Sequence, residues 1–463
     1  MNNHRLTSSI LLALCVLVSL AEHSWAQDES TPSTEPTSPD QSSWPSWRGV
    51  NGTGVSESAK PPTVWSEKKN IRWKTAIPGL GHATPVVWRD TVFLVTSIPV
   101  GDPFEPIPDK APGAHDNLSV SQRWSFVALA VDRVSGKIKW QRELHKAIPH
   151  EGSHVSGSLA SASPVTDGKH LIVSFGSYGI YCLDMEGKLL WQQTVGVLNT
   201  KHGHGEGASP TMYKDTVIVN CDHEGQSFLI TFDVKDGKER WRVKRDEVTS
   251  WSSPIVYEHA GKPQVIVAGT AAVRGYDLAT GKVIWSCGGL SNNIVATPIA
   301  EDGVVYVGSS YEIRSMLAIR LQDAKGDITG DKEQVIWRRT TRTPYVPTPL
   351  LYRNRLYFLR HYQGIVSIVD AATGDEPLGP FRITGLRNIY ASPVAADGKI
   401  FITDREGATV VLSEPEMPKI LSANLLEDRF SASMVLVDRQ IFLRGEKFLY
   451  CIEETESDAA PSK

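Results

Sequence analysis

The sequence predicts an all-β protein, an eight-bladed β-propeller with four-stranded antiparallel blades that is closed by an N-terminal strand. Three observations predict this fold: a unit that recurs eight times, short strands of alternating polarity within each unit, and a tryptophan at a fixed place in the fourth strand. The 463 residues include 37 glycines, 28 prolines and 13 tryptophans, a composition typical of many turns and short strands rather than of a helical bundle.

Each unit begins with an apolar strand that follows a small or hydroxyl residue. In seven units a proline stands between them, and Met434 takes that place in the eighth. The first interval between these positions is 79 residues and the others are 41 to 51 residues, which is the length of one propeller blade. The prolines are Pro85, Pro164, Pro210, Pro254, Pro298, Pro349 and Pro393. Radial repetition of such blades lets each sheet bury its faces against its neighbours.

The second half of a typical unit is a hairpin with glycine in its turn, as in residues 276–282, and a strand that ends near a tryptophan. We expect each indole ring to cover the edge of its own blade and to pack on the next. The rings are Trp140, Trp191, Trp241, Trp285 and Trp337. The eighth unit stops without a fourth strand, whereas residues 70–77 form a stray strand before the first unit. We therefore expect this N-terminal strand to complete the last blade and remove an open edge.

The two ends of the chain predict export. An apolar run of about ten residues is followed by Ser24-Trp25-Ala26, a pattern typical of a cleaved signal peptide and too short to span a bilayer. We expect a monomeric protein of the periplasm, the extracellular space or the cell envelope, with no transmembrane segment. The predicted organisation is a signal peptide over 1–26, a Ser/Thr/Pro-rich linker over 27–43, an N-terminal extension over 44–70, the propeller over 71–453 and a disordered tail over 454–463.

The balance of charge excludes one class of partner. Lysine and arginine total 48 against 52 aspartates and glutamates, so the formal net charge is −4, and no basic block interrupts the chain. Nucleic-acid binding needs a basic footprint to contact phosphates. The sequence therefore predicts no nucleic-acid partner.

The hairpin motif over 276–285 resembles the tryptophan-docking repeat of pyrroloquinoline-quinone (PQQ) propellers, and the similarity covers residues 71–453. Residues 42–56 also look like the start of exported bacterial proteins with PQQ-like repeats. This family is related in fold to the quinoprotein alcohol dehydrogenases and to the propeller subunit of the outer-membrane β-barrel assembly machinery. The resemblance implies the fold, but the same propeller serves as an enzyme or as a scaffold.

The residues that a quinoprotein dehydrogenase needs form no complete set here. The resemblance implies an adjacent pair of cysteines and an aspartate beside a calcium ion, yet Cys182, Cys221, Cys287 and Cys451 are scattered and no CxxCH haem motif is present. We expect these four thiols to be free and buried. The sequence identifies no certain cofactor, and PQQ and a divalent metal are the two candidates.

The residues that precede the first strand of each blade are expected to converge on the propeller axis. The long loops also gather at that face, which is where rigid scaffolds usually carry binding sites. The candidate ligand-binding residues are His82, His154, Trp251, Asn292, Asn293, Tyr345, Asn388, Tyr390 and Arg429.

Blade three has the densest group of imidazoles and carboxylates. Such side chains ligate divalent metals or act as general acids and bases, and they also form polar networks that hold loops in place. All three interpretations stay open at this point. The candidate metal ligands are His202, His204, Glu206, Asp222, His223 and Glu224.

The sequence as a whole favours an exported, non-catalytic propeller that binds a protein partner or a small polar ligand at its loop-rich face. The alternative is a PQQ-dependent or metal-dependent oxidoreductase or hydrolase that uses the central funnel. An enzyme of this fold would be quinoprotein-dehydrogenase-like.

Overall fold

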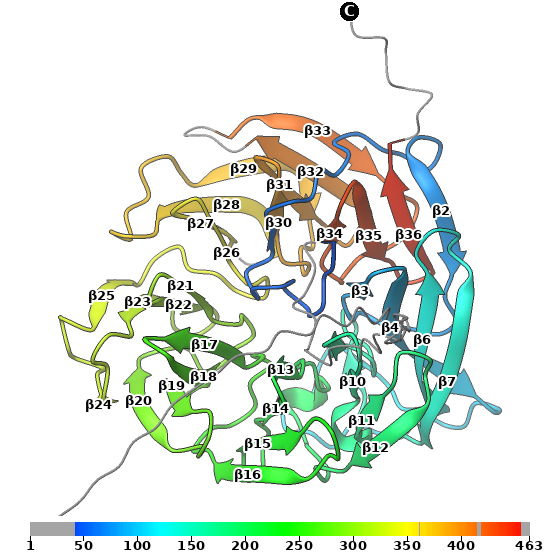
Figure 1. The fold of residues 1–463 in the computed structure, drawn as a ribbon, viewed down its shortest axis with the longest axis horizontal. Helices are drawn as coiled ribbons and strands as arrows, with labels where there is room; N and C mark the ends of the chain where they lie inside the picture. The colour runs from blue at the N-terminus through cyan, green and yellow to red at the C-terminus, as the bar shows by residue number, and fades with distance from the viewer. Residues whose placement is uncertain (1–41, 361, 414–417, 455–463) are drawn as a thin grey trace, which may run out of the picture. The chain divides into compact units, whose positions relative to one another are not determined.

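The computed structural model describes residues 42–360, 362–413 and 418–454. The predicted signal peptide, nearly all of the linker and the tail after residue 454 lie outside the described residues. The described chain is a ring of eight four-stranded antiparallel blades, so the predicted fold is confirmed (Figure 1).

The strands follow the repeat in chain order, innermost strand first in each blade. Blade one is β3 (Val86–Trp88), β4 (Thr91–Val100), β6 (Arg123–Asp132) and β7 (Ile138–Ala147); blade two is β9 (Val165–Thr166), β10 (Leu171–Ser174), β11 (Ile180–Leu183) and β12 (Leu189–Gln193); blade three is β13 (Thr211–Tyr213), β14 (Thr216–Cys221), β15 (Phe228–Asp233) and β16 (Glu239–Lys244). Blade four is β17 (Ile255–His259), β18 (Lys262–Ala268), β19 (Ala272–Asp277) and β20 (Val283–Gly288); blade five is β21 (Ile299–Glu301), β22 (Val304–Ser309), β23 (Ser315–Arg320) and β25 (Val335–Arg339).

The remaining blades continue round the ring. Blade six is β26 (Leu350–Tyr352), β27 (Arg355–Leu359), β28 (Gln363–Asp370) and β29 (Phe381–Arg387); blade seven is β30 (Val394–Ala396), β31 (Lys399–Thr403), β32 (Ala408–Ser413) and β33 (Ile420–Leu425); blade eight is β34 (Val435–Val437), β35 (Gln440–Arg444), β36 (Phe448–Glu453) and β2 (Ile71–Ala76). The short strands β1 (Val55–Ser56), β5 (Asn117–Leu118), β8 (Ser153–His154) and β24 (Gly326–Asp327) and two 3-10 turns, η1 (Gly176–Tyr178) and η2 (Lys201–Gly203), lie outside this repeat.

The burial of the strands explains why the sequence repeats as it does. Middle strands such as β14 are mostly apolar and are buried along their whole length, because both of their faces pack against neighbouring blades. Outer strands such as β16 alternate charged and partly buried residues, because one face meets solvent. Apolar contacts between blades therefore form the core of the ring.

The N-terminal strand closes the ring as the sequence predicts. Strand β2 pairs antiparallel with β36, with Lys74 opposite Tyr450 and Thr75 opposite Leu449. It is the fourth strand of blade eight, so strands from the two ends of the propeller share one sheet. This pairing covers the edge of β36, which would otherwise be open to another chain.

The tryptophans of the fourth strands dock on the next blade. Trp140, Trp191, Trp241 and Trp337 each donate their indole N–H to a backbone carbonyl of the following blade, over 2.7 to 3.0 Å. The ring of Trp191 also lies against Gly237, whose φ is +72°. A Cβ at Gly237 would come within 2.7 Å of that ring, so the docking site requires glycine in the hairpin turn.

Trp285 departs from this arrangement. Its indole N–H donates to the side-chain oxygen of Gln264 in its own blade, at 2.8 Å. In blade five, residues 321–334 replace the short hairpin on which the ring would dock, and their strand β24 pairs with β20 instead. Trp285 is buried in one apolar cluster with blade-five residues, so it differs from the other four rings only in the acceptor of its indole N–H.

A closed circle of eight hydrogen bonds surrounds the propeller axis. The residue before each proline, or before Met434, donates its backbone N–H to the hydroxyl of its counterpart in the next blade, at 2.9 to 3.1 Å. Its members are Thr84, Ser163, Ser209, Ser253, Thr297, Thr348, Ser392 and Ser433, which we call the hydroxyl ring. All eight residues are buried. The repeated hydroxyl residue thus satisfies a buried N–H of the preceding blade.

The N-terminal extension crosses the centre of the ring on the side away from the long loops. Trp44 pairs with Val87 of blade one, and Val55 in β1 pairs parallel with Ala395 of blade seven. The buried guanidinium of Arg48 donates to the carbonyls of Pro393 and Thr53 at 2.9 and 2.8 Å. In Figure 1 this segment is the dark blue trace beside β30 and β34.

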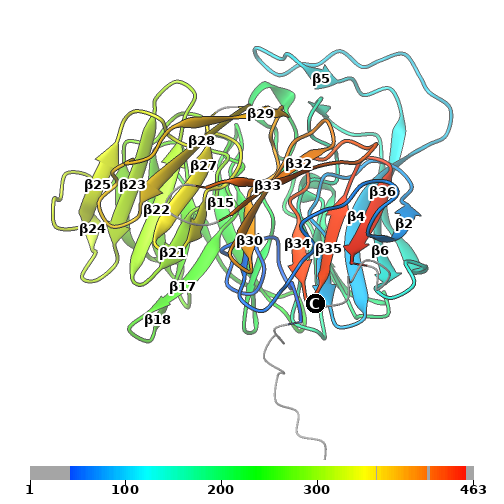
Figure 2. The same cartoon turned by 90° about the horizontal axis from the view of Figure 1, so that it is seen from above.

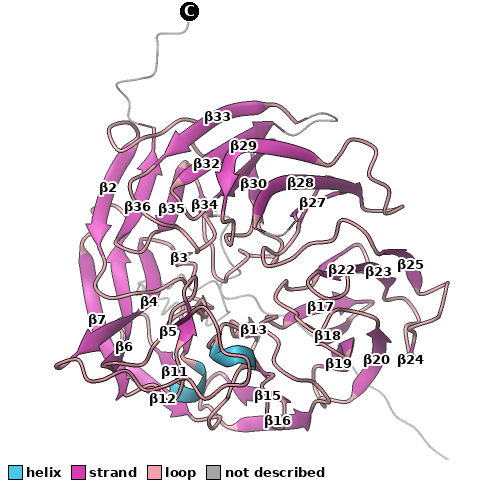
Figure 3. Cartoon of the chain, turned by 180° about the vertical axis from the view of Figure 1, so that it is seen from behind, coloured by secondary structure: helices cyan, strands magenta, loops and turns pink. Residues whose placement is uncertain are grey.

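The longest insertion of blade one folds back over the other side of the ring. Residues 101–122 leave β4, and their strand β5 pairs with β8 at the start of blade two. Figure 2 shows that β5 reaches beyond the blades at one face, and Figure 3 shows it beside the two short helical turns. The long loop predicted for the ligand-binding face is therefore a structured flap.

The four cysteines in the described part of the chain are free and buried, as expected from their spacing. Within residues 42–360, 362–413 and 418–454 no helix is long and apolar enough to cross a membrane.

Candidate functional site

A cavity of about 590 Å³ lies on the propeller axis at the face that carries the flap. We call it the funnel. Its wall is formed by residues that precede the first strands, by loops that follow the second strands and by the flap. Members of the hydroxyl ring and Trp47 of the N-terminal extension also line it. A concave site of this size on a rigid scaffold suits a small ligand.

Six of the nine candidate ligand-binding residues line the funnel, and three do not. The six are His82, His154, Trp251, Asn293, Tyr345 and Tyr390. The side chain of Asn292 instead donates to Glu312, that of Asn388 donates to Glu406, and Arg429 is exposed outside the funnel. Asn293, which follows Asn292, and Tyr390, two residues after Asn388, do line it.

The six candidate metal ligands separate into two groups. His202, His204 and Glu206 line the funnel. The other three side chains have partners elsewhere. Asp222 pairs with Arg245, His223 bonds to the carbonyl of Gln226, and Glu224 accepts from Thr249. Among the described residues, no three His, Cys, Asp or Glu side chains are placed to hold a metal ion.

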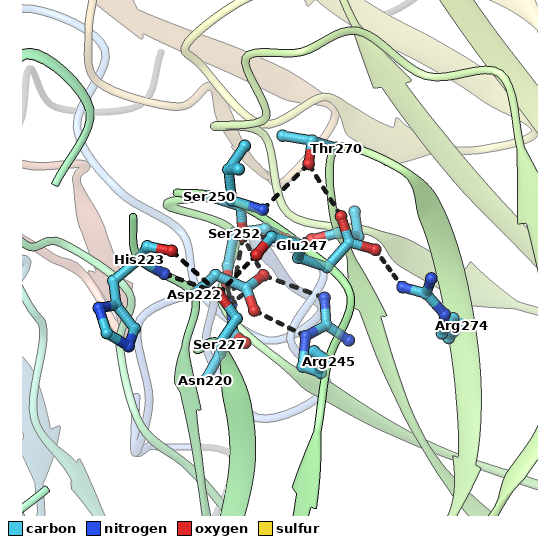
Figure 4. A network of polar contacts seen from close by, with 12 residues as sticks. Asn220, Asp222, His223, Ser227, Arg245, Glu247, Ser250, Ser252, Thr270 and Arg274 are labelled. Carbon is cyan, nitrogen blue, oxygen red and sulfur yellow. Dashed lines mark hydrogen bonds and ion pairs between the residues drawn. The ribbon is translucent and has the colours of Figure 1, made fainter. Parts of the chain in front are cut away.

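Asp222 belongs to a buried network between blades three and four (Figure 4). Both of its carboxylate oxygens accept from Arg245, at 2.7 and 3.0 Å, and one also accepts from Ser250 at 2.6 Å. The second acid of the network, Glu247, accepts from Thr270 and pairs with Arg274. Because these charged groups are paired and hydrogen-bonded, the network holds the two blades together.

Four imidazoles meet where the flap lies on blades two and three. The ring of His204 is 4.9 Å from that of His115, 4.8 Å from that of His154 and 5.4 Å from that of His202, measured between centroids. The pKa of His204 is lowered to about 4 by burial and then by the neighbouring His154. His204 is therefore uncharged at neutral pH. His115 was missed by the sequence reasoning because it comes from the flap.

His82 is buried in the funnel wall with both ring nitrogens lacking a hydrogen-bond partner among the described residues. The nearby carboxylate oxygen of Glu446 is 3.8 Å from Nε2, which is too long for a hydrogen bond. Burial lowers the pKa of His82, which favours the neutral ring, and a neutral ring has one donor and one acceptor. A buried polar group without partners is rare in a folded protein.

Glu206 also lines the funnel. Both carboxyl oxygens accept from the backbone N–H of Ser177, at 3.0 Å. Burial and, to a lesser extent, the nearby carboxylate of Glu151 raise the pKa of Glu206 to about 8. A carboxyl group with this pKa is mostly protonated at neutral pH and adds little charge to the funnel.

Four tyrosines form the side of the funnel opposite the histidines. The ring centroids are 5.9 Å apart for Tyr311 and Tyr345, 5.3 Å for Tyr345 and Tyr362, and 4.8 Å for Tyr362 and Tyr390. Tyr311 and Tyr362 were missed by the sequence reasoning. Both follow the second strand of their blade, in the loops that the topology brings to this face, so that rule would have found them.

The comparisons with known proteins agree with this fold. Residues 125–345 match the family model described as "Outer membrane protein assembly factor BamB". The chain carries PQQ-like repeats. BamB from Moraxella catarrhalis is similar in structure, with a TM-score of 0.52 and 15% identity over 78% of this chain and 99% of that chain. No curated protein matches the sequence.

A second similar structure belongs to an enzyme. Quinohemoprotein alcohol dehydrogenase from Comamonas testosteroni has a TM-score of 0.59 and 10% identity, over 91% of this chain and 82% of that chain. At such identities the PQQ-like repeat propellers share a fold, and the function has to be argued from the site.

The funnel does not fit the quinone that this fold family implies. PQQ carries several carboxylates, which need cationic partners in a partly buried site. Among the described lining residues the funnel has no arginine and one lysine, Lys201. The amino group of Lys201 already lies 3.4 Å from the carbonyl of Asn292 and 4.0 Å from Glu312. The lining thus lacks the charge that a polycarboxylate requires.

Proposed function

We propose that this protein is a non-catalytic binding propeller that takes a small polar ligand in the funnel. The observation that carries the proposal is His82, a buried imidazole in the wall of a cavity of about 590 Å³ whose nitrogens have no hydrogen-bond partner among the described residues. A ligand with a polar group at this point would satisfy the ring. Leaving such a group unpaired costs about 1–3 kcal/mol.

Ligand-induced stabilisation tests this proposal. Melting temperature is measured against a library of small polar compounds, and each hit is titrated calorimetrically with the wild type and with His82→Ala. We expect at least one hit whose affinity falls about tenfold or more in the variant, which corresponds to about 1.4 kcal/mol. His259→Ala, on the hairpin β17–β18 outside the funnel, is the matched control. Equal affinities for the two variants would place the ligand elsewhere.

The same purified protein can be used to test the enzymatic alternative. A PQQ-dependent oxidoreductase would bind PQQ with Ca²⁺ and oxidise alcohols in a dye-linked assay. Since the lining lacks cationic partners for the quinone, we expect neither saturable quinone binding nor dye reduction. Dye reduction that depends on added PQQ would overturn the non-catalytic assignment.

A protein partner at the same face is the second candidate function. It is supported by the family match to an outer-membrane protein assembly factor and by exposed apolar side chains around the funnel, Leu118 and Val155 at the flap and Ile313 in blade five. A photo-crosslinker at position 118 or 313, in the native host, should give one discrete adduct. The same probe at the exposed position 283, on outer strand β20, should give none. Equal labelling at all three positions would argue against a partner at this face.

We further propose export to the cell envelope, based on the signal-like residues 1–26 and on the envelope protein named in the family match. N-terminal sequencing of the protein recovered from its native cells tests this. We expect the mature chain to begin at Gln27, whereas a chain that retains residues 1–26 would contradict the prediction.

A further inference from the structure

The two sides of the funnel differ in chemistry. Blades one to three contribute His82, His154 and His204, and blades five to seven contribute the four tyrosines. In a ring of eight blades, blade one faces blade five, blade two faces blade six, and blade three faces blade seven. The imidazole side therefore lies across the axis from the aromatic side. A ligand between them meets hydrogen-bonding nitrogens on one flank and aromatic rings on the other.

The described lining is almost free of charge. Of its members only Asp116, Lys201 and Glu206 are formally ionisable as acids or strong bases. Asp116 sits on the exposed flap, Lys201 is engaged by Glu312, and Glu206 is mostly protonated at neutral pH. Behind the deeper wall, the buried guanidinium of Arg405 pairs with Glu446 at 3.0 Å, so its charge is already compensated. A charged ligand would lose its hydration there without a counter-charge to replace it.

Hydroxyl groups match what this wall offers. A neutral imidazole presents one donor and one acceptor, and a hydroxyl can serve both. Serines add hydroxyl oxygens around the funnel: Ser161 and Ser431 donate to the carbonyls of Ser158 and Ser156, and each keeps an oxygen that can accept. The opposite aromatic surface suits the C–H face of a sugar ring, which is apolar although its rim carries hydroxyls. One molecule with both kinds of surface is a neutral carbohydrate.

We infer that the funnel binds a neutral, polyhydroxylated ligand of the carbohydrate class. This inference rests on the proposed function and narrows it from small polar ligands in general. It rests on the opposed imidazole and tyrosine sides, on the unpartnered nitrogens of His82 and on the scarcity of cations in the described lining. A neutral ligand of this class differs from PQQ, the carboxylated quinone that the fold family implies.

A glycan array followed by calorimetry tests the ligand class. The purified protein is applied to neutral glycans and to acidic glycans that contain uronic or sialic acids. The strongest hit, PQQ with Ca²⁺, and the free tetrasaccharides of glucose and of N-acetylglucosamine are then titrated. We expect saturable binding of a neutral glycan, with affinity that changes less than twofold between 50 and 500 mM NaCl because no ion pair forms.

Variants locate the binding site. Tyr390→Ala and His82→Ala should each weaken the neutral glycan at least tenfold, and Tyr390→Trp should restore most of the affinity by replacing the aromatic surface. Tyr213→Ala is the matched control, because Tyr213 lies in β13 outside the funnel lining. Circular dichroism and melting temperature identify any variant that fails to fold. If Tyr390→Ala does not fold, the affinity of Tyr390→Trp for the neutral glycan tests the role of the tyrosines.

The outcomes distinguish the inference from the proposed function. Binding of acidic glycans or of PQQ alone, weakened by His82→Ala, would overturn the carbohydrate inference and keep a ligand in the funnel. Neutral-glycan binding that His82→Ala and Tyr390→Ala leave unchanged would overturn both assignments to the funnel. Binding of no glycan, together with a hit of another class from the compound library, would overturn the inference alone. No binding in either screen would overturn both.

Discussion

Two polar regions of the propeller differ in how far their hydrogen bonds are satisfied. In the network between blades three and four, both oxygens of Asp222 accept from Arg245, and Glu247 is paired as well. On the funnel side, the ring nitrogens of His82 in blade one have no hydrogen-bond partner among the described residues, and Glu206 in blade three accepts from the backbone N–H of Ser177. The sequence alone shows similar residue types in both. The comparison teaches that saturation of hydrogen bonds, rather than residue type, separates a structural polar group from a binding one.

Removal of the buried cation should have the largest effect. Arg245→Met leaves the Asp222 carboxylate buried without its partner, so we expect a loss of about 3–5 kcal/mol in the free energy of unfolding. The control is Arg242→Met in the same strand, whose exposed ion pair with Glu239 should change stability by less than about 1 kcal/mol. Urea denaturation of both variants measures the difference. A similar small loss in the two variants would show that the network is not structural.

The pH dependence of stability should report Glu206. Its pKa is raised from 4.5 to about 8 in the folded protein. Between these two pH values the native state therefore keeps a proton that the unfolded chain has released. This contribution to stability is lost as pH rises from about 4.5 to about 8. Glu206→Gln removes that loss, and we expect the variant to gain on the order of 2–4 kcal/mol relative to wild type between pH 5 and pH 9. Parallel stability profiles over this range would contradict the raised pKa.

One break in the hydroxyl ring should have an intermediate effect. Ser163→Ala leaves the buried N–H of Thr84 without its acceptor, at a cost of about 1–3 kcal/mol. Ser135→Ala, in an exposed hairpin turn, is the control and should cost less than about 0.5 kcal/mol. Thermal denaturation measures both. Equal losses would show that the ring adds nothing beyond ordinary turn contacts.

The smallest effect on stability is expected at the binding side. His82→Asn keeps a polar amide at the wall and breaks no hydrogen bond to described residues, so we expect a change of about 1 kcal/mol or less in the free energy of unfolding. Chemical denaturation without ligand measures this. A loss as large as that of Arg245→Met would make His82 a structural residue and would end the contrast between the two regions.

Much of the fold was predictable from the chain itself. The repeat spacing and hairpin turns indicate eight blades, and the stray strand at 70–77 predicts the closure that β2 makes. The site was predictable only in part. Of the candidate ligand residues, Asn293 and Tyr390 face the funnel whereas Asn292 and Asn388 do not. The irregular backbone before each first strand has no fixed period, so the sequence does not show which of two neighbours faces the axis.

The sequence by itself determined the blades, their hairpins and the closing strand, because these depend on contacts that recur at a fixed spacing along the chain. The tertiary structure alone decided which polar groups are paired. Arg245 reaches Asp222 across 23 residues, the flap brings the carbonyl of His115 to His204 across 89, and Ser433 meets Thr84 across 349. A hydrogen bond requires two groups within about 3 Å, and only the folded ring brings such distant groups together.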